Sequence, residues 1–243
     1  MNKTSLRAEL KGDGMRSQCF RSRIVVLSLV VIAACASQSI MLHKGERIVF
    51  LGDSITHQAV QPNGFVTLID DTLTARHPGW GIEIIGAGIS GNRVPDLQKR
   101  LASDVLDKQP TLVVVYIGIN DVWHWKNNRG TTKSDYENGL KDIVRKIQAA
   151  GAHVILCTPS VIGEKKNGAN AQDTMLEEYV QISRKVAREL GCELCDLHKA
   201  FVDYLAANNP DDKEKGVLTR DGVHLNPLGN RFVAEQMLRA MGE

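Results

Sequence analysis

Five short apolar runs, separated by segments of helical pattern, constrain the fold of this chain more than any other feature. Several runs are continuously apolar, as in LVVVYI, which is typical of strands buried on both faces of a parallel sheet. Strands alternating with helices predict an α/β domain: a three-layer α/β/α sandwich with right-handed crossovers. The expected strands are Arg47 to Leu51, Ile82 to Gly86, Leu112 to Ile117, His153 to Cys157 and Glu193 to Leu197.

Three of the remaining segments carry clear helix signals. Ser134-Asp-Tyr-Glu137 has the pattern of a capping box, followed by an apolar helix face and a stop at Gly151. A second apolar face runs from Leu176 to Leu190 and ends at Gly191. Asn226-Pro227 supplies an N-cap and a first-turn proline for a C-terminal helix.

The N-terminus has the pattern of an export leader. Arginines precede the apolar run Ile24 to Ala34, which small residues close. The run is too short to span a bilayer as a helix, which takes about 20 residues. We therefore expect residues 1–36 to be a cleaved export signal peptide, 37–45 a linker and 46–243 the folded domain.

Two processing sites are open in this leader. Ile32-Ala-Ala-Cys35 resembles a bacterial lipobox, in which Cys35 is lipidated, while Ala34-Cys-Ala36 is an alternative A-x-A cleavage site. Met15 is an alternative start, because the leader from there has more ordinary proportions. The sequence predicts an exported protein, either periplasmic, held at a bacterial membrane by a lipid anchor, or secreted.

Charge and cysteine content exclude some classes of function. Residues 1–35 hold six basic and two acidic residues, which leaves 24 basic and 26 acidic residues in the rest, so nothing in the body indicates a nucleic-acid partner. Cys192 and Cys195 form a C-x-x-C pair, but three residues apart in a strand they point to opposite faces. Cys157 is expected to be buried. We find no metal-ligand spacing, and expect no metal and no cofactor.

Reactive side chains follow the expected strands, where open α/β sheets bind their ligands. Ser54 follows the first run in GDSIT, and a serine nucleophile needs a base oriented by a third group. In Asp221-Gly-Val-His224 the spacing allows the carboxylate to bind Nδ1 of the imidazole and leaves Nε2 to accept a proton from Ser54. Gly91 and Asn120 follow the second and third runs and, with the Ser54 amide, are candidate oxyanion donors.

These residues resemble a known family, the SGNH hydrolases, also called the GDSL esterase/lipase family. Gly52-Asp-Ser54, Gly91, Gly118-Ile-Asn120-Asp121 and Asp221-x-x-His224 are similar to its four sequence blocks and occur in the family's order. The resemblance covers roughly residues 46–242. It implies a flavodoxin-like sandwich with a five-stranded parallel sheet in the order 2-1-3-4-5.

The resemblance implies a role for each matching residue. Ser54 would be the nucleophile and would also donate its backbone N–H to the oxyanion. Gly91 would add a second backbone N–H, and Asn120 a side-chain amide. His224 would act first as base and then as acid, with Asp221 orienting it. The chain would thus be a serine esterase with a Ser-His-Asp triad that works through an acyl-enzyme.

The substrate is indicated by fewer residues. Trp123 and Trp125 follow the third run; an indole can stack on a sugar ring, or it can pack down its own loop. Arg93 could bind a substrate anion, although we favour an ion pair with a neighbouring acid. Residues 160–172 are polar and hold no apolar lid, which favours short acyl groups. We expect acetyl esters, such as O-acetylated carbohydrates.

Three alternatives remain open at this point. A lysophospholipase or thioesterase acting on lipids, or an O-acyltransferase, could use the same triad. A non-catalytic flavodoxin-like domain could use GDSIT to hold an anion at a helix N-terminus. We expect a small-molecule or glycan ester as the bound partner, and the sequence does not indicate an oligomeric state.

Overall fold

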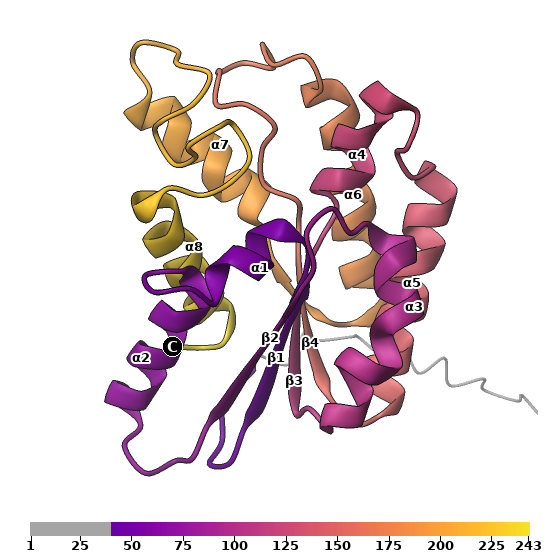
Figure 1. The fold of residues 1–243 in the computed structure, drawn as a ribbon, viewed down its shortest axis with the longest axis vertical. Helices are drawn as coiled ribbons and strands as arrows, with labels where there is room; N and C mark the ends of the chain where they lie inside the picture. Colours follow the sequence, from indigo (N-terminus) through magenta and orange to yellow (C-terminus); the bar gives the residue numbers. More distant parts are fainter. Residues whose placement is uncertain (1–39) are drawn as a thin grey trace, which may run out of the picture. The chain divides into compact units, whose positions relative to one another are not determined.

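The computed structural model describes residues 40–243, so the predicted signal peptide, Cys35 and Met15 lie outside the described residues. Five strands form one parallel sheet in the order β2-β1-β3-β4-β5, as the resemblance implies. The predicted α/β/α sandwich is confirmed (Figure 1). The strands are β1 (Arg47–Gly52), β2 (Glu83–Gly88), β3 (Leu112–Tyr116), β4 (His153–Cys157) and β5 (Glu193–Cys195).

Helices cover both faces of the sheet, and Figure 1 shows them as two separate layers. One layer holds α3 (Val94–Asp104), α5 (Lys133–Ala149) and α6 (Asp173–Leu190), with α5 packed between the other two. The other holds α1 (Ser54–Ala59), α2 (Phe65–Arg76), α7 (Leu197–Asn208) and α8 (Pro227–Ala240). The short segments η1 (Leu106–Lys108), α4 (Ile119–Trp123) and η2 (His124–Asn127) complete the described elements.

The two layers bury the middle of the sheet. Every residue of β3 is buried, which explains its continuously apolar sequence. The edge strand β2 is only partly buried and contains two glycines. The glycines are needed because α1 lies close to this strand: a Cβ on Gly88 would lie 2.1 Å from the backbone nitrogen of His57. Gly88 pairs with Gly52 of β1, so strand β2 ends two residues beyond the predicted end.

The end of β5 and the start of α5 also differ from the prediction, while the other strand boundaries agree to within one residue. Strand β5 ends at Cys195, because the Asp196 side chain accepts a hydrogen bond from the Lys199 N–H and caps α7. The apolar pattern predicts Leu197 as the last residue of the strand, but this buried residue is the first residue of α7. Helix α5 begins at Lys133, with Thr132 rather than Ser134 as its N-cap; the Thr132 hydroxyl accepts from the Asp135 N–H. The predicted capping box is wrong, because the helix starts before it.

The end of α6 at Gly191 and the start of α8 at Asn226 match the prediction. Gly191 follows α6 with a left-handed φ of 63°, and the Asn226 side chain accepts from the Gly229 N–H. Ile40 and Leu42, which fall in the predicted linker, are buried against the core of the domain. Within residues 40–243, no helix is long and apolar enough to cross a membrane.

The cysteines of the described domain are free and buried. Cys157 lies in the core, as expected, and burial raises the pKa of its thiol, which leaves it unreactive. Cys192 and Cys195 form no disulfide with each other. The pKa of the Cys192 thiol is likewise raised by burial, to about 11.

Candidate active site

Ser54 is the first residue of α1, directly beyond the carboxyl end of β1. Gly52 allows this tight turn, since a Cβ there would lie 2.6 Å from the Tyr116 carbonyl oxygen on the neighbouring strand. Asp53 is the N-cap, and its carboxyl accepts a 2.9 Å hydrogen bond from the Ile55 N–H. These contacts hold the Ser54 side chain at the sheet edge with only 9% of its surface exposed.

The structure brings Ser54, His224 and Asp221 into one hydrogen-bonded chain. Ser54 Oγ lies 2.9 Å from His224 Nε2, although the two residues are 170 positions apart. His224 Nδ1 lies 2.8 Å from Asp221 Oδ2. The predicted pairing of each imidazole nitrogen is therefore present in the structure.

The Asp221 carboxylate is arranged to stay ionised. Burial alone would raise its pKa, but hydrogen bonds from the His224 backbone and ring and from the Val223 N–H together hold the pKa of Asp221 below its ordinary value. An ionised Asp221 requires the hydrogen of His224 to sit on Nδ1. The lone pair of Nε2 then faces the Ser54 hydroxyl, as a general base requires.

Glu164 holds the loop that carries Asp221 and His224, and sequence reasoning missed it. This fully buried carboxylate accepts hydrogen bonds from the backbone N–H groups of residues 217, 218 and 219 and from the Thr219 hydroxyl. The adjacent Gly163 N–H donates to the Gly222 carbonyl at 2.8 Å. Glu164 lies in a polar loop without any motif, so no local signal identified it.

Gly91 and Asn120 lie on the loops that follow β2 and β3. Gly52 at the end of β1 pairs with Gly88 and with Tyr116, so the three strands end at one level and their loops share one edge. Gly91 has φ of 80°, a left-handed conformation that favours glycine. The buried Asn120 donates one amide hydrogen to the Asn92 carbonyl at 3.0 Å. Its second amide hydrogen is available for a ligand.

Two buried carboxyl groups lie behind the nucleophile. Burial raises the pKa of Asp53 to about 7, and the nearby Asp121 adds to the rise. Burial also raises the pKa of Asp121 to about 6, although its carboxylate accepts from the Val94 N–H at the start of α3. Each of the two carboxyl groups accepts a hydrogen bond from a backbone N–H at a helix start, Asp53 at α1 and Asp121 at α3.

These raised pKa values predict a pH-dependent stability. Above the ordinary carboxyl pKa of 3.8 the unfolded chain loses the Asp53 proton, whereas the folded protein keeps it up to about pH 7. The free energy of unfolding should therefore fall as pH rises through this window, by at most about 1.4 kcal/mol per pH unit for one group. Asp53→Asn retains a cap acceptor but cannot titrate.

Urea unfolding of both proteins between pH 4 and pH 8 measures this effect. We expect Asp53→Asn to gain stability relative to the unmodified protein as pH rises. A stability difference that does not change with pH would contradict the assignment of a raised pKa to Asp53.

Trp123 lies beside the catalytic candidates. Its ring meets the His224 ring edge to face, with centroids 6.3 Å apart. Lys126 Nζ lies 4.3 Å from the centroid of the same indole. Trp123, Lys126, Gln172 and Asp221 line an open cavity of about 220 Å³ next to the predicted triad.

Trp125 and Arg93 serve other contacts. Trp125 donates to the Tyr179 hydroxyl at 3.1 Å and packs where a Cβ on Gly130 would clash, so it fastens its own loop. Arg93 pairs with Asp96 at 3.4 Å and donates to the Arg129 carbonyl. The preferred interpretation of Arg93 as an ion-pair partner is confirmed.

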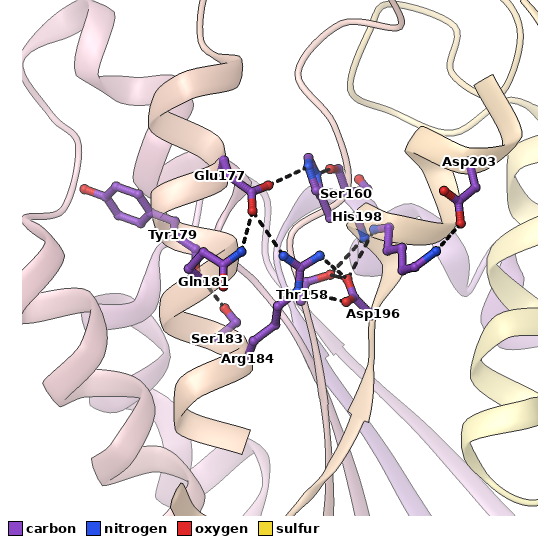
Figure 2. A network of polar contacts seen from close by, with 11 residues as sticks. Thr158, Ser160, Glu177, Tyr179, Gln181, Ser183, Arg184, Asp196, His198 and Asp203 are labelled. Atoms are coloured by element: carbon purple, nitrogen blue, oxygen red, sulfur yellow. Dashed lines mark hydrogen bonds and ion pairs between the residues drawn. The ribbon is translucent and has the colours of Figure 1, made fainter. Parts of the chain in front are cut away.

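A network of polar contacts joins α6, the residues that follow β4 and the start of α7 (Figure 2). Arg184 of α6 binds Asp196 at 2.8 Å, and the Thr158 hydroxyl donates to the same carboxylate. His198 lies between Glu177 and the Ser160 carbonyl.

A second cavity, of about 380 Å³, lies beside His198 and Glu177 and is lined by none of the predicted triad residues. In the described part of the chain, no cluster of three or more histidine, cysteine or acidic residues could hold a metal ion.

The sandwich and the hydrogen-bonded Ser-His-Asp chain at its edge define a serine hydrolase type of site. The model of the GDSL-like Lipase/Acylhydrolase family matches residues 50–232. The chain therefore belongs to this family, which is the one that the sequence motifs resemble, and it is an ester-hydrolysing enzyme.

Relatives include an acetylxylan esterase of Geobacillus stearothermophilus, which is 30% identical over 82% of this chain and 94% of its own. The crystal structure of another acetyl xylan esterase, AlAXEase, superimposes with a TM-score of 0.78 at 44% identity, over 80% of this chain and 98% of that chain. A Bacillus subtilis protein named as an uncharacterized lipoprotein, YqeF, is 26% identical over 63% of this chain and 71% of its own.

Solved structures of the Geobacillus enzyme, 28% identical to this chain, include three catalytic mutants. Each mutant has one residue replaced by alanine: a serine in the first, an aspartate in the second and a histidine in the third. They superimpose with TM-scores of 0.74 to 0.75 and cover 84% of this chain and 97% of theirs.

Proposed function

We propose that this esterase removes acetyl groups from carbohydrates, with acetylated xylan as the substrate class, through a Ser54-His224-Asp221 triad. The observation that carries the proposal is the chain of 2.9 and 2.8 Å contacts from Ser54 Oγ through the imidazole to Asp221. The acetylxylan esterases among the relatives, and the serine, aspartate and histidine of the Geobacillus catalytic mutants, support the same substrate and the same residue types.

In the first half-reaction, Ser54 Oγ attacks the carbonyl carbon of the acetyl ester while His224 Nε2 accepts the hydroxyl proton. The carbonyl oxygen becomes an oxyanion, which receives hydrogen bonds from the backbone N–H groups of Ser54 and Gly91 and from the Asn120 amide. His224 then gives its proton to the departing sugar oxygen. The acetyl group stays on Ser54 as an acyl-enzyme.

The second half-reaction reverses these proton transfers. A water molecule gives a proton to His224 Nε2 and attacks the acetyl carbon, and Ser54 recovers its proton as acetate leaves. The imidazole is positively charged in both transition states. The ionised Asp221, 2.8 Å from Nδ1, stabilises that charge and keeps the ring in place.

The surroundings of the triad suit a polar leaving group. Trp123 places an indole beside His224, where a sugar ring can stack, and the adjoining cavity of about 220 Å³ also presents the polar side chains of Lys126 and Gln172. The lining also includes Ile162 and Val223, so the cavity is small and mixed in character. A short acyl group on a carbohydrate fits a cavity of this size and lining better than a long fatty acyl chain does.

We propose export as the location of this activity, with Cys35 as the lipid anchor. The leader pattern and the lipoprotein name of the Bacillus subtilis relative support this. The mass of the mature N-terminus distinguishes a lipidated Cys35 from cleavage after Ala36.

An acyl-length series tests the substrate class. We expect kcat/KM for p-nitrophenyl acetate to exceed that for the octanoate by at least about tenfold, because the extra methylenes would have to enter a small cavity that also holds Lys126 and Gln172. Acetylated xylan should release acetate with the unmodified protein and not with Ser54→Ala. A preference for octanoate would instead indicate a lipid hydrolase, and transfer of acetyl to an added alcohol in preference to water would indicate an acyltransferase.

A further inference from the structure

Arg100 connects four separate parts of the structure at the edge where the predicted site lies. Its side chain comes from α3 and is only 12% exposed. It donates to the carbonyls of Gly52 and Ala87 at 2.7 and 3.0 Å, to the Asn92 side-chain oxygen at 2.7 Å and to Asp104 at 2.8 Å. One guanidinium therefore joins the ends of β1 and β2, the loop after β2 and the last turn of α3.

This arrangement uses the properties of an arginine that lysine lacks. A guanidinium holds five donors in a rigid plane and stays charged, so it can bind several acceptors in fixed directions. The Asp104 contact alone would be an ordinary pair between residues four apart on a helix. The other three acceptors lie outside α3, so Arg100 links the strand ends and the loop to the helix.

Asn92 links Arg100 to the predicted oxyanion donors. Its side-chain oxygen accepts from Arg100 Nε, and its backbone carbonyl accepts from Asn120 Nδ2 at 3.0 Å. Gly91 directly precedes Asn92 and has the left-handed φ of 80° that turns the loop. The positions of the Gly91 N–H and the Asn120 amide therefore depend on where Asn92 is held.

We propose that Arg100 is a positioning residue of the oxyanion site: it fixes the Gly91-Asn92 turn and, through the Asn92 carbonyl, the Asn120 amide. This inference rests on the proposed function, because it requires an oxyanion to form at Ser54. Arg100 itself does not touch the substrate. Its contribution is preorganisation of donors, which acts in the transition state and little in the bound ester.

Steady-state kinetics of Arg100→Gln with p-nitrophenyl acetate tests the proposal. We expect kcat to fall by about 10- to 100-fold with KM within about twofold, because a misplaced oxyanion donor weakens transition-state binding. Lys99→Gln is the matched control: it lies on the same helix, its side chain is 76% exposed, and it should leave kcat unchanged. Arg100→Lys, which retains charge but not the planar fork, should recover only part of the loss.

A double-mutant cycle separates positioning from a general loss of structure. In the Asn120→Ala background, Arg100→Gln should cost several-fold less than in the unmodified enzyme, because one of the groups it positions is already missing. Fully multiplicative losses would overturn the proposal. Asn92→Ala tests the same connection while leaving the Arg100–Asp104 pair in place, so the test does not depend on the folding of an Arg100 variant.

Unchanged kcat in Asn92→Ala, or a loss of activity that is matched by a rise in KM, would also overturn the proposal. Failure of the proposed function looks different. In that case the unmodified protein itself would show no turnover that depends on Ser54, and the Arg100 variants would not be the cause.

Discussion

Ser54→Ala and His224→Ala are each expected to lower kcat for p-nitrophenyl acetate by about 10⁴-fold or more, because nucleophile and base act as one unit. Ser54 Oγ and His224 Nε2 lie 2.9 Å apart, so removing either atom removes the acyl-enzyme route. The double variant should be no less active than either single variant. The measurement is the initial rate of nitrophenol release at several ester concentrations.

His57→Ala is the matched control for this experiment. His57 lies on α1, three residues beyond Ser54, but its ring contacts the Gly88 carbonyl at 3.2 Å and not the nucleophile. It should keep kcat within about threefold, as expected for a side chain outside the reacting groups. Turnover that survives in Ser54→Ala would contradict the triad assignment. Equal losses of kcat in His57→Ala and His224→Ala would contradict the assignment of His224 as the base.

Asn120→Ala is expected to lower kcat by about 100- to 1000-fold while KM changes little, as for the loss of one oxyanion donor. The physical reason is that the amide hydrogen binds charge that develops only in the transition state. Asn120→Asp should be at least as harmful, because a carboxylate supplies an acceptor and a negative charge in the same place.

Asn138→Ala serves as the control for Asn120. Its side chain lies on α5 and bonds only weakly to Ser134, at 3.4 Å, so activity should not change. Thermal unfolding of Asn120→Ala shows whether its lost bond to the Asn92 carbonyl affects stability. If Asn120→Ala is folded and retains its kcat, Asn120 is not an oxyanion donor.

Local patterns in the sequence were sufficient to predict the sandwich and three reactive residues. The apolar runs marked all five strands, since a strand buried on both faces must be apolar whatever its partners are. The turn after the first run marked the candidate nucleophile, and the Asp221-x-x-His224 loop marked the candidate base and the carboxylate that orients it. The start of α8 at Asn226 was predicted correctly, but that of α5 was not: Thr132 instead of Ser134 caps α5, because either hydroxyl fits the local pattern.

The sequence by itself therefore determined the fold class, the order of the elements and which side chains are chemically able to react. Tertiary structure alone decided how those side chains are held. Arg100 meets Gly52 across 48 positions and Glu164 meets residues 217–219 across 53 to 55, while neither lies in a motif. A residue that acts through such distant hydrogen bonds leaves no periodicity in its own segment. Its partners appear only when the chain has folded.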